Sequence, residues 1–444
     1  MTSTPRATPA PSPGRRWRNW GRSVTAHPRR FAAPTTVDEL VAVIADARDS
    51  GLPVRPVGAG HSFTPIAATD GIQLDVSALD GLLAVDGDLV TLGAGTNLYQ
   101  LPALLEPLGL ALQNRGDIDR QTIAGATSTG THGTGLAFGG LATRIRAATL
   151  LTASGQVLRV APDENAELLP AVALGLGALG VLIDVTIQCV PAFALHAVER
   201  PEPIDTVLAE WRARVESSDH FEFYVWPHTE TVLTKTNTRL PADAAQHPLP
   251  PFGRWFDDEF MANGVYRLTL NLGRALPAVV PPLNRLSVRL TGDREFTDLS
   301  PNVFTTNRSV RFREMEYAVP LDAVPPVVDR IRALIADRRW SISFPIEVRA
   351  AAADDLWLST ANGRETGYVA VHRYFREDPT EYFAAVEAIM REFDGRPHWG
   401  KMHSRSADDL RPAYPRFDDF VAVRDRLDPE RLFSNPYLTR VLGS

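Results

Sequence analysis

The stretch that decides the fold is Val57-Gly58-Ala59-Gly60-His61-Ser62-Phe63. It follows an apolar run at residues 52–57 that we interpret as a strand. Glycines at positions 58 and 60 allow a tight turn and a close approach of the backbone to a ligand. Successive exposed N–H groups in such a turn bind phosphate oxygens. The third glycine of the dinucleotide-binding pattern is missing, so this stretch alone indicates either a phosphate-binding turn or an ordinary one.

A second glycine-rich stretch reads Q-T-I-A-G-A-T-S-T-G-T-H-G-T-G at residues 121–135. Its four glycines and five threonines disfavour regular helices and strands. The composition predicts a long loop whose amides and hydroxyls surround a polar ligand. Two such stretches, each with one histidine, indicate a single large cofactor.

Together with three later motifs, these stretches resemble a known family. The later motifs are G-A-L-G-V-L at 177–182, P-I-E-V-R at 345–349 and R-P-H-W-G-K at 396–401. In consistent order from about residue 19 onward, the set resembles the vanillyl-alcohol oxidase (p-cresol methylhydroxylase-type) superfamily of flavoproteins. Within it, the match is to the sugar-lactone and alditol oxidase branch.

The expected fold class is α+β, because helices and strands alternate without βαβ regularity. The resemblance implies a two-domain p-cresol methylhydroxylase-type FAD-binding fold with an antiparallel-sheet cap domain. Prolines at 191, 201 and 203 mark the predicted boundary. We therefore predict a disordered tail at 1–18, an FAD-binding domain at 19–192 and a cap, or substrate, domain at 193–444.

Composition narrows the function classes. A net charge of -7 argues against nucleic-acid binding as the main task. No apolar run is long enough to cross a bilayer, so we expect no stable membrane insertion. The twin arginine at 15–16 lacks a following apolar region, and we expect a cytoplasmic protein. The single cysteine, Cys189, excludes an internal disulfide and a Cys-rich metal site, and we expect no metal.

The resemblance implies FAD as cofactor, bonded covalently through His61. A neutral imidazole is a competent nucleophile for such a bond; the alternative is a histidine that only packs against the ring. His132 is expected to support the second loop or to contact the cofactor. The predicted cofactor-binding residues are Gly58, Ala59, Gly60, His61, Ser62, Gly116, Asp117, Thr122, Gly125, Ala126, Thr127, Ser128, Gly130, His132, Gly133 and Leu182.

Glu347 and Arg349 lie two residues apart in a predicted strand, so their side chains share one face. Alone, this pair is compatible with an ordinary salt bridge. The resemblance implies that both face substrate in front of the flavin, and that Lys401 stabilises negative charge on the reduced ring. Lysine occurs only twice among 46 Lys and Arg residues, which makes Lys401 informative. His372 is expected to contact substrate or to be an ordinary sheet histidine.

The predicted catalytic residues are Glu347, Arg349, Lys401 and His372, and Asp117 joins them in substrate binding. The resemblance implies oxidation of an aldono-1,4-lactone by hydride transfer to flavin N5, with Glu347 or His372 as base. Gly116 permits reoxidation of the reduced flavin by O₂, and a separate electron-acceptor protein is the alternative. Alternatives are an alditol, cyclitol or natural-product alcohol oxidase of the same fold, and, more remotely, a non-enzymatic sugar-binding protein.

Overall fold

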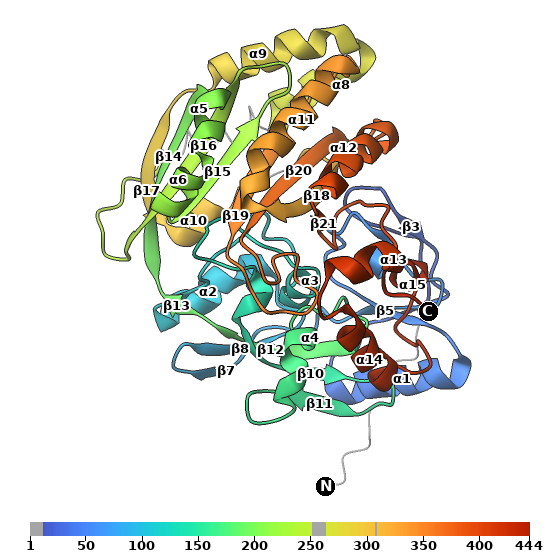
Figure 1. Cartoon of the computed structure of the whole chain (residues 1–444). Helices are drawn as coiled ribbons and strands as arrows, with labels where there is room; N and C mark the ends of the chain where they lie inside the picture. The colour runs from blue at the N-terminus through green and yellow to red at the C-terminus, as the bar shows by residue number, and fades with distance from the viewer. Residues whose placement is uncertain (1–11, 251–262, 307–308) are drawn as a thin grey trace.

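The computed structural model describes residues 12–250, 263–306 and 309–444, which form two parts that lie against each other (Figure 1). The first part contains a sheet of order β1-β4-β6-β5 and an antiparallel sheet of order β11-β10-β12-β8-β7. Its strands are β1 (Ser12–Pro13), β4 (Arg30–Ala32), β5 (Val54–Val57), β6 (Ile72–Asp75), β7 (Leu82–Asp86), β8 (Leu89–Gly93), β10 (Ile145–Leu151), β11 (Val157–Val160) and β12 (Val181–Gln188). Its helices are α1 (Val37–Ser50), α2 (Leu101–Leu105), α3 (Ile123–Ser128) and α4 (Leu169–Val172).

The second part is built on an eight-stranded sheet of order β17-β14-β16-β15-β19-β20-β18-β21, in which every pair is antiparallel. The predicted antiparallel sheet is therefore confirmed. The strands are β14 (Phe193–Pro203), β15 (His220–Val225), β16 (Thr231–Pro241), β17 (Arg294–Leu299), β18 (Phe312–Pro320), β19 (Ile346–Ala351), β20 (Thr366–Tyr374) and β21 (Arg396–Pro397). The helices are α5 (Ile204–Ala209), α6 (Trp211–Ser217), α8 (Tyr266–Ala275), α9 (Val280–Leu290), α10 (Ser300–Phe304), α11 (Val324–Asp337) and α12 (Thr380–Glu392).

The central strands of this sheet present apolar and charged side chains on opposite faces, because alternate residues of a strand point in opposite directions. Phe223, Val348 and Met315 belong to the apolar core that α11 and α12 help to cover. The charged residues next to them in sequence, Glu347 and Glu314 among them, lie on the other face. This alternation turns a row of ionisable groups away from the helices.

The C-terminal segment returns to the first part of the molecule. It carries α13 (Ala407–Leu410), α14 (Phe417–Leu427) and α15 (Pro436–Leu442). Phe417 and Leu438 share a core with strands β8, β10 and β12, and Phe433 packs with α1 and β6. The division at residues 192/193 stays a prediction, but these last residues do not pack as a cap.

The N-terminal tail is more ordered than predicted where the structure describes it. Residues 1–11 lie outside the described residues. Ser12 and Pro13 pair with Phe31 and Arg30, and Trp17–Arg18 (β2) pairs with Thr25–Ala26 (β3). The prediction of disorder is therefore wrong for residues 12–18, because these pairings satisfy their backbone groups.

Two shorter segments connect the parts. Leu110–Ala111 (β9) pairs with Val190–Pro191 (β13), which immediately precedes β14.

Over the described ranges, no helix combines the length and the apolarity that crossing a bilayer requires.

Candidate active site

The turn at residues 58–62 follows β5 and touches the second glycine-rich stretch. Gly60 has φ of +68°, a conformation that L side chains rarely adopt. A Cβ on Gly58 would lie 2.5 Å from Oγ1 of Thr122. Only glycine at position 58 therefore allows the two stretches to approach this closely.

The second stretch is not the continuous loop that we predicted. Ile123–Ser128 forms the short helix α3, and Thr122 caps it by accepting a hydrogen bond of 3.1 Å from the Gly125 N–H. Side-chain capping offsets the poor helix propensity of Gly125 and Thr127. The hydroxyls of Thr127 and Thr129 donate to carbonyls four residues earlier, so they face the helix backbone.

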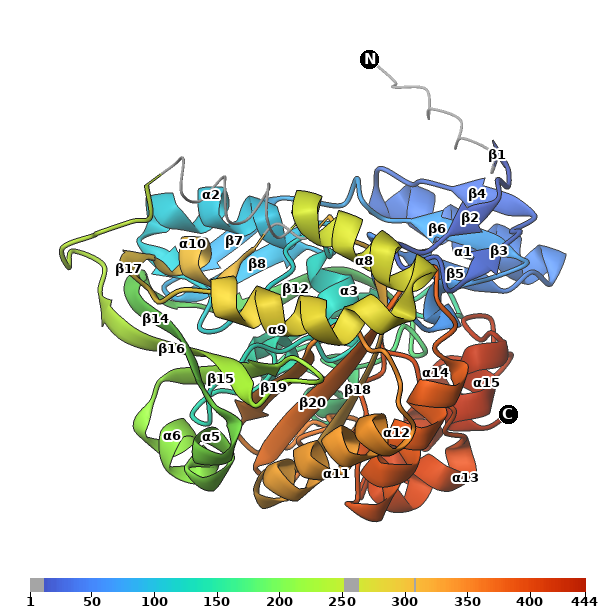
Figure 2. The same cartoon turned by 90° about the horizontal axis from the view of Figure 1, so that it is seen from above.

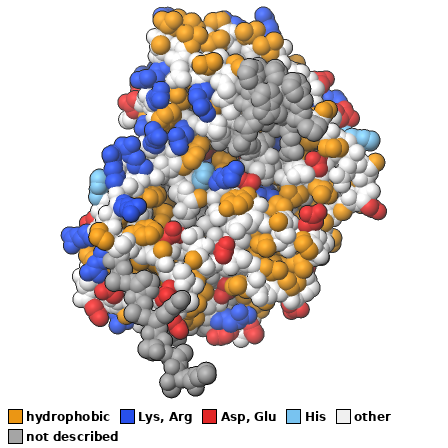
Figure 3. Space-filling model, turned by 180° about the vertical axis from the view of Figure 1, so that it is seen from behind, with side chains coloured by type: hydrophobic (Ala, Val, Ile, Leu, Met, Phe, Trp, Pro, Cys, Tyr) orange, Lys and Arg blue, Asp and Glu red, His pale blue; other side chains and the backbone are white. Residues whose placement is uncertain are grey.

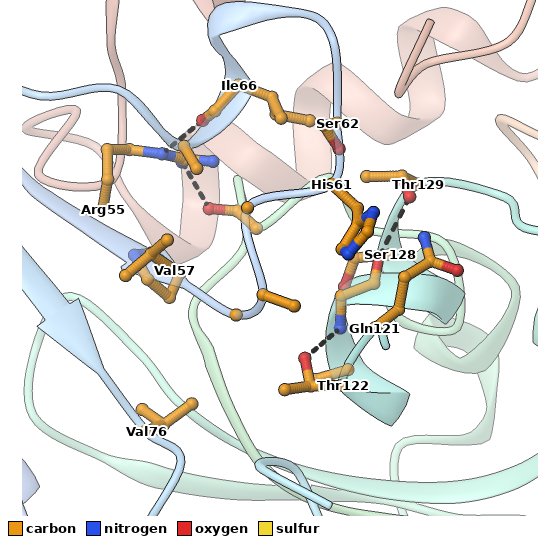
Figure 4. Close-up of a pocket in the computed structure, with 18 of the residues that line it drawn as sticks. Arg55, Val57, His61, Ser62, Ile66, Val76, Gln121, Thr122, Ser128 and Thr129 are labelled. Atoms are coloured by element: carbon orange, nitrogen blue, oxygen red, sulfur yellow. Dashed lines mark hydrogen bonds between the residues drawn. The ribbon is translucent and has the colours of Figure 1, made fainter. Parts of the chain in front are cut away.

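The turn and α3 enclose one side of a cavity of about 860 Å³, part of it open to solvent (Figure 4). Strand β12 and the residues just before it close another side. Nine of the predicted cofactor-binding residues line this cavity, namely Gly58, Ala59, Gly60, His61, Ser62, Thr122, Gly125, Ser128 and Leu182.

Of the other seven predicted cofactor-binding residues, three line the second cavity described below and four line neither cavity. Ala126 is fully buried in the core that contains β8, β10 and β12, and Thr127 is buried beside it. Gly130 borders a separate small cavity. Gly133 packs against the backbone of Arg115, where a Cβ would lie 2.3 Å from the carbonyl oxygen.

Arg55, on β5, is a buried guanidinium whose hydrogen bonds within the described part of the chain all go to carbonyl oxygens (Figure 4). It donates to Ile66, Gly177 and Leu176 at 2.9, 2.8 and 3.1 Å, and also to Phe433. Burial lowers its pKa to about 10, which still leaves it charged at neutral pH. A cation that lines the cavity favours an anionic ligand.

A second cavity, of about 790 Å³ and also open to solvent, adjoins the first. Both cavities are lined by His61, Ser62, Gln121 and Thr129, so the two spaces meet there. The second cavity is lined by every predicted catalytic residue and by Gly116, Asp117 and His132.

The paired cavities fit FAD. One has a glycine turn and a buried arginine suited to a diphosphate, and the other has charged groups suited to the reacting end of the flavin and a polar substrate. An elongated cofactor that passes His61 would occupy both.

His61 lies where the cavities meet and stacks on Trp20, with ring centroids 5.4 Å apart. Burial lowers its pKa to about 4, with smaller contributions from Lys401 and Arg120. The imidazole is therefore neutral at pH 7, which is the nucleophilic form.

Arg349 sits among three carboxylates. Its Nη2 lies 2.7 Å from Asp117 Oδ1 and 2.5 Å from Glu347 Oε1, and its Nε lies 2.9 Å from Glu222 Oε2. Burial alone would lower the Arg349 pKa, but Asp117, Glu347 and Glu222 raise it well above its ordinary value. The guanidinium is held in place from three sides, as a group that must orient a substrate requires.

Lys401 forms a second cluster beside the first. Its Nζ contacts Glu314 and lies 3.6 Å from Glu316 and 5.5 Å from the centre of the Phe63 ring. Burial would lower the Lys401 pKa, but the two glutamates raise it overall. Although burial opposes it, the ammonium lowers the pKa of Glu314 to about 2.

His372 joins this second cluster. Its Nδ1 lies 3.0 Å from the Pro345 carbonyl oxygen and its Nε2 lies 3.5 Å from Glu314 Oε1. Since a carbonyl only accepts hydrogen bonds, Nδ1 carries a proton. In the neutral ring, Nε2 therefore holds the lone pair.

His132 supports the site from behind. Its Nε2 lies 2.5 Å from Glu316 Oε1, its Nδ1 lies 2.8 Å from the Gly133 carbonyl oxygen, and its ring stacks on Tyr368 with centroids 3.6 Å apart. His132 lines the second cavity as well, so loop support and a cofactor contact are both compatible with its place.

Sequence reasoning missed Glu222, Glu314 and Glu316. Glu314 and Glu316 alternate with Met315 and Tyr317, the same pattern that revealed Glu347 and Arg349. That signal was available, but no local pattern shows that β18 lies beside β20, or β15 beside β19.

Comparisons with known proteins agree with this geometry. The D-arabinono-1,4-lactone oxidase family model matches residues 185–441, and an FAD-binding domain model matches residues 28–161. The chain is 44% identical over 429 residues to L-gulono-1,4-lactone dehydrogenase of Mycobacterium tuberculosis, covering 96% of this chain and 99% of the relative. It is 34% identical to L-gulonolactone oxidase of Bos taurus and 31% identical to alditol oxidase of a Streptomyces species, each over 96% of this chain and 98% of the relative.

Solved structures show the same fold. Cholesterol oxidase from B. sterolicum superposes with a TM-score of 0.83 at 17% identity and covers 100% of this chain and 99% of its own. The expected p-cresol methylhydroxylase-type α+β fold is therefore confirmed, as is FAD as the cofactor. By its match over residues 185–441, the chain belongs to the D-arabinono-1,4-lactone oxidase family of flavoproteins.

Proposed function

We propose that this FAD-dependent oxidoreductase acts on the CH–OH group of an aldono-1,4-lactone, with L-gulono-, L-galactono- and D-arabinono-1,4-lactone as first candidates. The proposal rests on two neighbouring ion clusters, one around Arg349 and one around Lys401. Both lie in the second cavity, which meets the cavity of the glycine turn at His61. Such a polar cavity suits a small molecule rich in hydroxyls. The names of the relatives favour a lactone as that molecule.

In this proposal, FAD held by the two cavities would supply the two-electron oxidant for the carbon that carries the C2 hydroxyl. Arg349 donates a hydrogen bond to the reacting oxygen and stabilises the negative charge that develops there. Asp117, Glu222 and Glu347 hold the guanidinium in its orientation. Lys401 supplies a fixed positive charge to the second cavity, where it would stabilise negative charge on the reduced cofactor, and Glu314 positions it.

We assign the proton of the substrate hydroxyl to His372 rather than to Glu347. Nε2 of His372 lies 3.5 Å from Glu314 Oε1, and both residues line the second cavity. A neutral His372 can therefore accept the proton there, and the Glu314 carboxylate stabilises the imidazolium that forms. Glu347 already has an ion pair with Arg349. His372→Gln should lower the rate of flavin reduction by about 100-fold with an unchanged flavin content. A much larger loss in Glu347→Gln than in His372→Gln would reverse the assignment.

We also propose that FAD is bonded covalently to His61. The proposal is supported by the neutral ring and its position where the cavities meet. The flavin of acid-precipitated wild-type protein should stay with the pellet, and that of His61→Ala should stay in solution. A colourless wild-type pellet from yellow protein would contradict the bond and leave the fold untouched.

The substrate and the acceptor can be tested together. Anaerobic bleaching of the flavin by a panel of lactones and alditols identifies the substrate class, and bleaching by alditols alone would overturn the lactone proposal. We propose O₂ or a separate electron acceptor for reoxidation; O₂ is compatible with Gly116 in the second cavity. Oxygen consumption compared with dye reduction separates these two. The cytoplasmic location stays a prediction.

A further inference from the structure

The helices α8 and α9 form an outer face of the second part. They are joined by Pro277–Val279 (η7), and Figure 2, which views the molecule from above, shows them in front of the rest. Five of the exposed large hydrophobic residues lie on them or between them, namely Leu268 (69% exposed), Leu272, Leu276, Leu286 and Leu290 (67% exposed). We call this set the leucine face.

The leucine face points away from the protein. Leu268 and Leu272 lie four residues apart on α8 and so share one side, whereas Leu270 and Gly273 are buried on the other. On α9, Leu286 and Leu290 repeat this spacing opposite buried Asn284 and Val288. Both helices are therefore packed on one side only.

The charged residues of the segment that forms this face all have one sign, and the next residue along the chain is an exposed acid, Asp293. Residues 263–292 contain four arginines, Arg267, Arg274, Arg285 and Arg289, and neither aspartate nor glutamate. All four arginines are exposed. In Figure 3, hydrophobic side chains gather at the top of the molecule, where Figure 1 places α9, with Lys and Arg side chains below them. The local excess of positive charge contrasts with the net charge of -7 of the whole chain.

We propose that α8 and α9 dock this enzyme onto an anionic lipid surface. Leucines opposite the packed side would enter the boundary between headgroups and acyl chains, and the flanking arginines would bind lipid phosphates while their stems stay apolar. Both features are needed, since a purely apolar face suits a protein partner as well. This is attachment at the surface and requires no spanning helix.

Co-sedimentation of the full chain with vesicles tests the proposal. The protein should bind vesicles of phosphatidylcholine with phosphatidylglycerol, bind pure phosphatidylcholine much less, and be released by salt. The double variant Leu272→Ser/Leu290→Ser should lower the partition coefficient by about tenfold or more. Arg285→Gln/Arg289→Gln should remove the preference for the anionic lipid.

Matched controls lie elsewhere on the surface. Leu83→Ser replaces another leucine that is 57% exposed, on the edge strand β7, and Arg426→Gln replaces another exposed arginine; both should bind like the wild type. Equal binding by the leucine double variant, or no binding by the wild type, would overturn the proposal. So would a wild-type dimer that the double variant converts to monomer, because a second copy would then cover the face. None of these outcomes depends on lactone oxidation.

Discussion

Replacing Glu222 tests the role of the carboxylates around Arg349; the same carboxylate also lies 3.7 Å from Lys235 Nζ. Its Oε2 lies 2.9 Å from Arg349 Nε, and Glu222 is buried on β15. Glu222→Gln keeps the shape and removes the charge, while Asp117 and Glu347 still hold the guanidinium. We expect a loss of about tenfold in kcat/KM for the lactone with unchanged flavin content, because partners that orient a reacting group contribute this much.

The matched control is Glu202→Gln, which removes a carboxylate from the ion pair with Arg214, away from both cavities. It should leave kcat/KM unchanged. Equal kinetics in the two variants would show that Glu222 only fills space.

At this scale, alternation within a strand was enough to predict that Glu347 and Arg349 share a face, and their 2.5 Å contact confirms it. The same rule applied to residues 314–316 would have found two more glutamates. Glu222 gave no such signal. Its importance arises from the pairing of Phe223 with Val348, which joins strands more than a hundred residues apart.

At the scale of elements, Gly58 and Thr122 couple the turn after β5 to the start of α3. Gly58→Ala would place a Cβ 2.5 Å from Thr122 Oγ1, the atom that caps α3. We expect the cap to be lost, which destabilises the protein by about 1 kcal/mol. FAD incorporation should fall as well, because both elements line the cavity of the glycine turn.

Flavin absorbance per protein after gel filtration, together with the free energy of unfolding, measures both effects. Gly292→Ala is the control, since no atom lies within 4 Å of its Cβ position and its φ is ordinary. A full flavin content together with an unchanged free energy of unfolding in Gly58→Ala would show that Thr122 can turn away freely.

Composition predicted the ligand-facing character of residues 121–135 but not the helix within them. Propensity disfavours helix there, and the Thr122 cap, with burial of Ile123 and Ala126 in the first core, overrides it. Burial of this kind depends on distant segments, which no local window contains.

At the scale of the whole molecule, the sequence indicated two parts but not the return of the C-terminal segment. Phe433 packs on α1 and accepts a hydrogen bond from Arg55 through its carbonyl, although 378 residues separate the two. The FAD cavity thus depends on residues from both ends of the chain. The order of the motifs predicts the family fold. That the C-terminal segment packs back on the first part is seen only in the structure.

Four buried or half-buried histidines, contributed by both parts of the molecule, make its stability depend on pH. Burial lowers the pKa of His61, His220 and His398 to about 4 and that of His403 to about 3. Between these values and the ordinary pKa of 6.5, the unfolded chain binds protons that the folded protein does not. Unfolding is therefore favoured as the pH falls, by about 1.4 kcal/mol per pH unit for each such histidine.

Chemical denaturation at a series of pH values from 7 to 4 measures this slope. His403→Gln should lower this slope by about 1.4 kcal/mol per pH unit, the contribution of one proton. Among the described residues, His403 Nε2 contacts the Tyr437 hydroxyl at 2.9 Å, and a glutamine amide can replace that contact. His27→Gln is the control, since that side chain is exposed and should leave the slope unchanged. A stability that stays constant from pH 7 to 5 would mean that these histidines accept protons in the folded protein. The neutral His61 on which the covalent bond depends would then lose its basis.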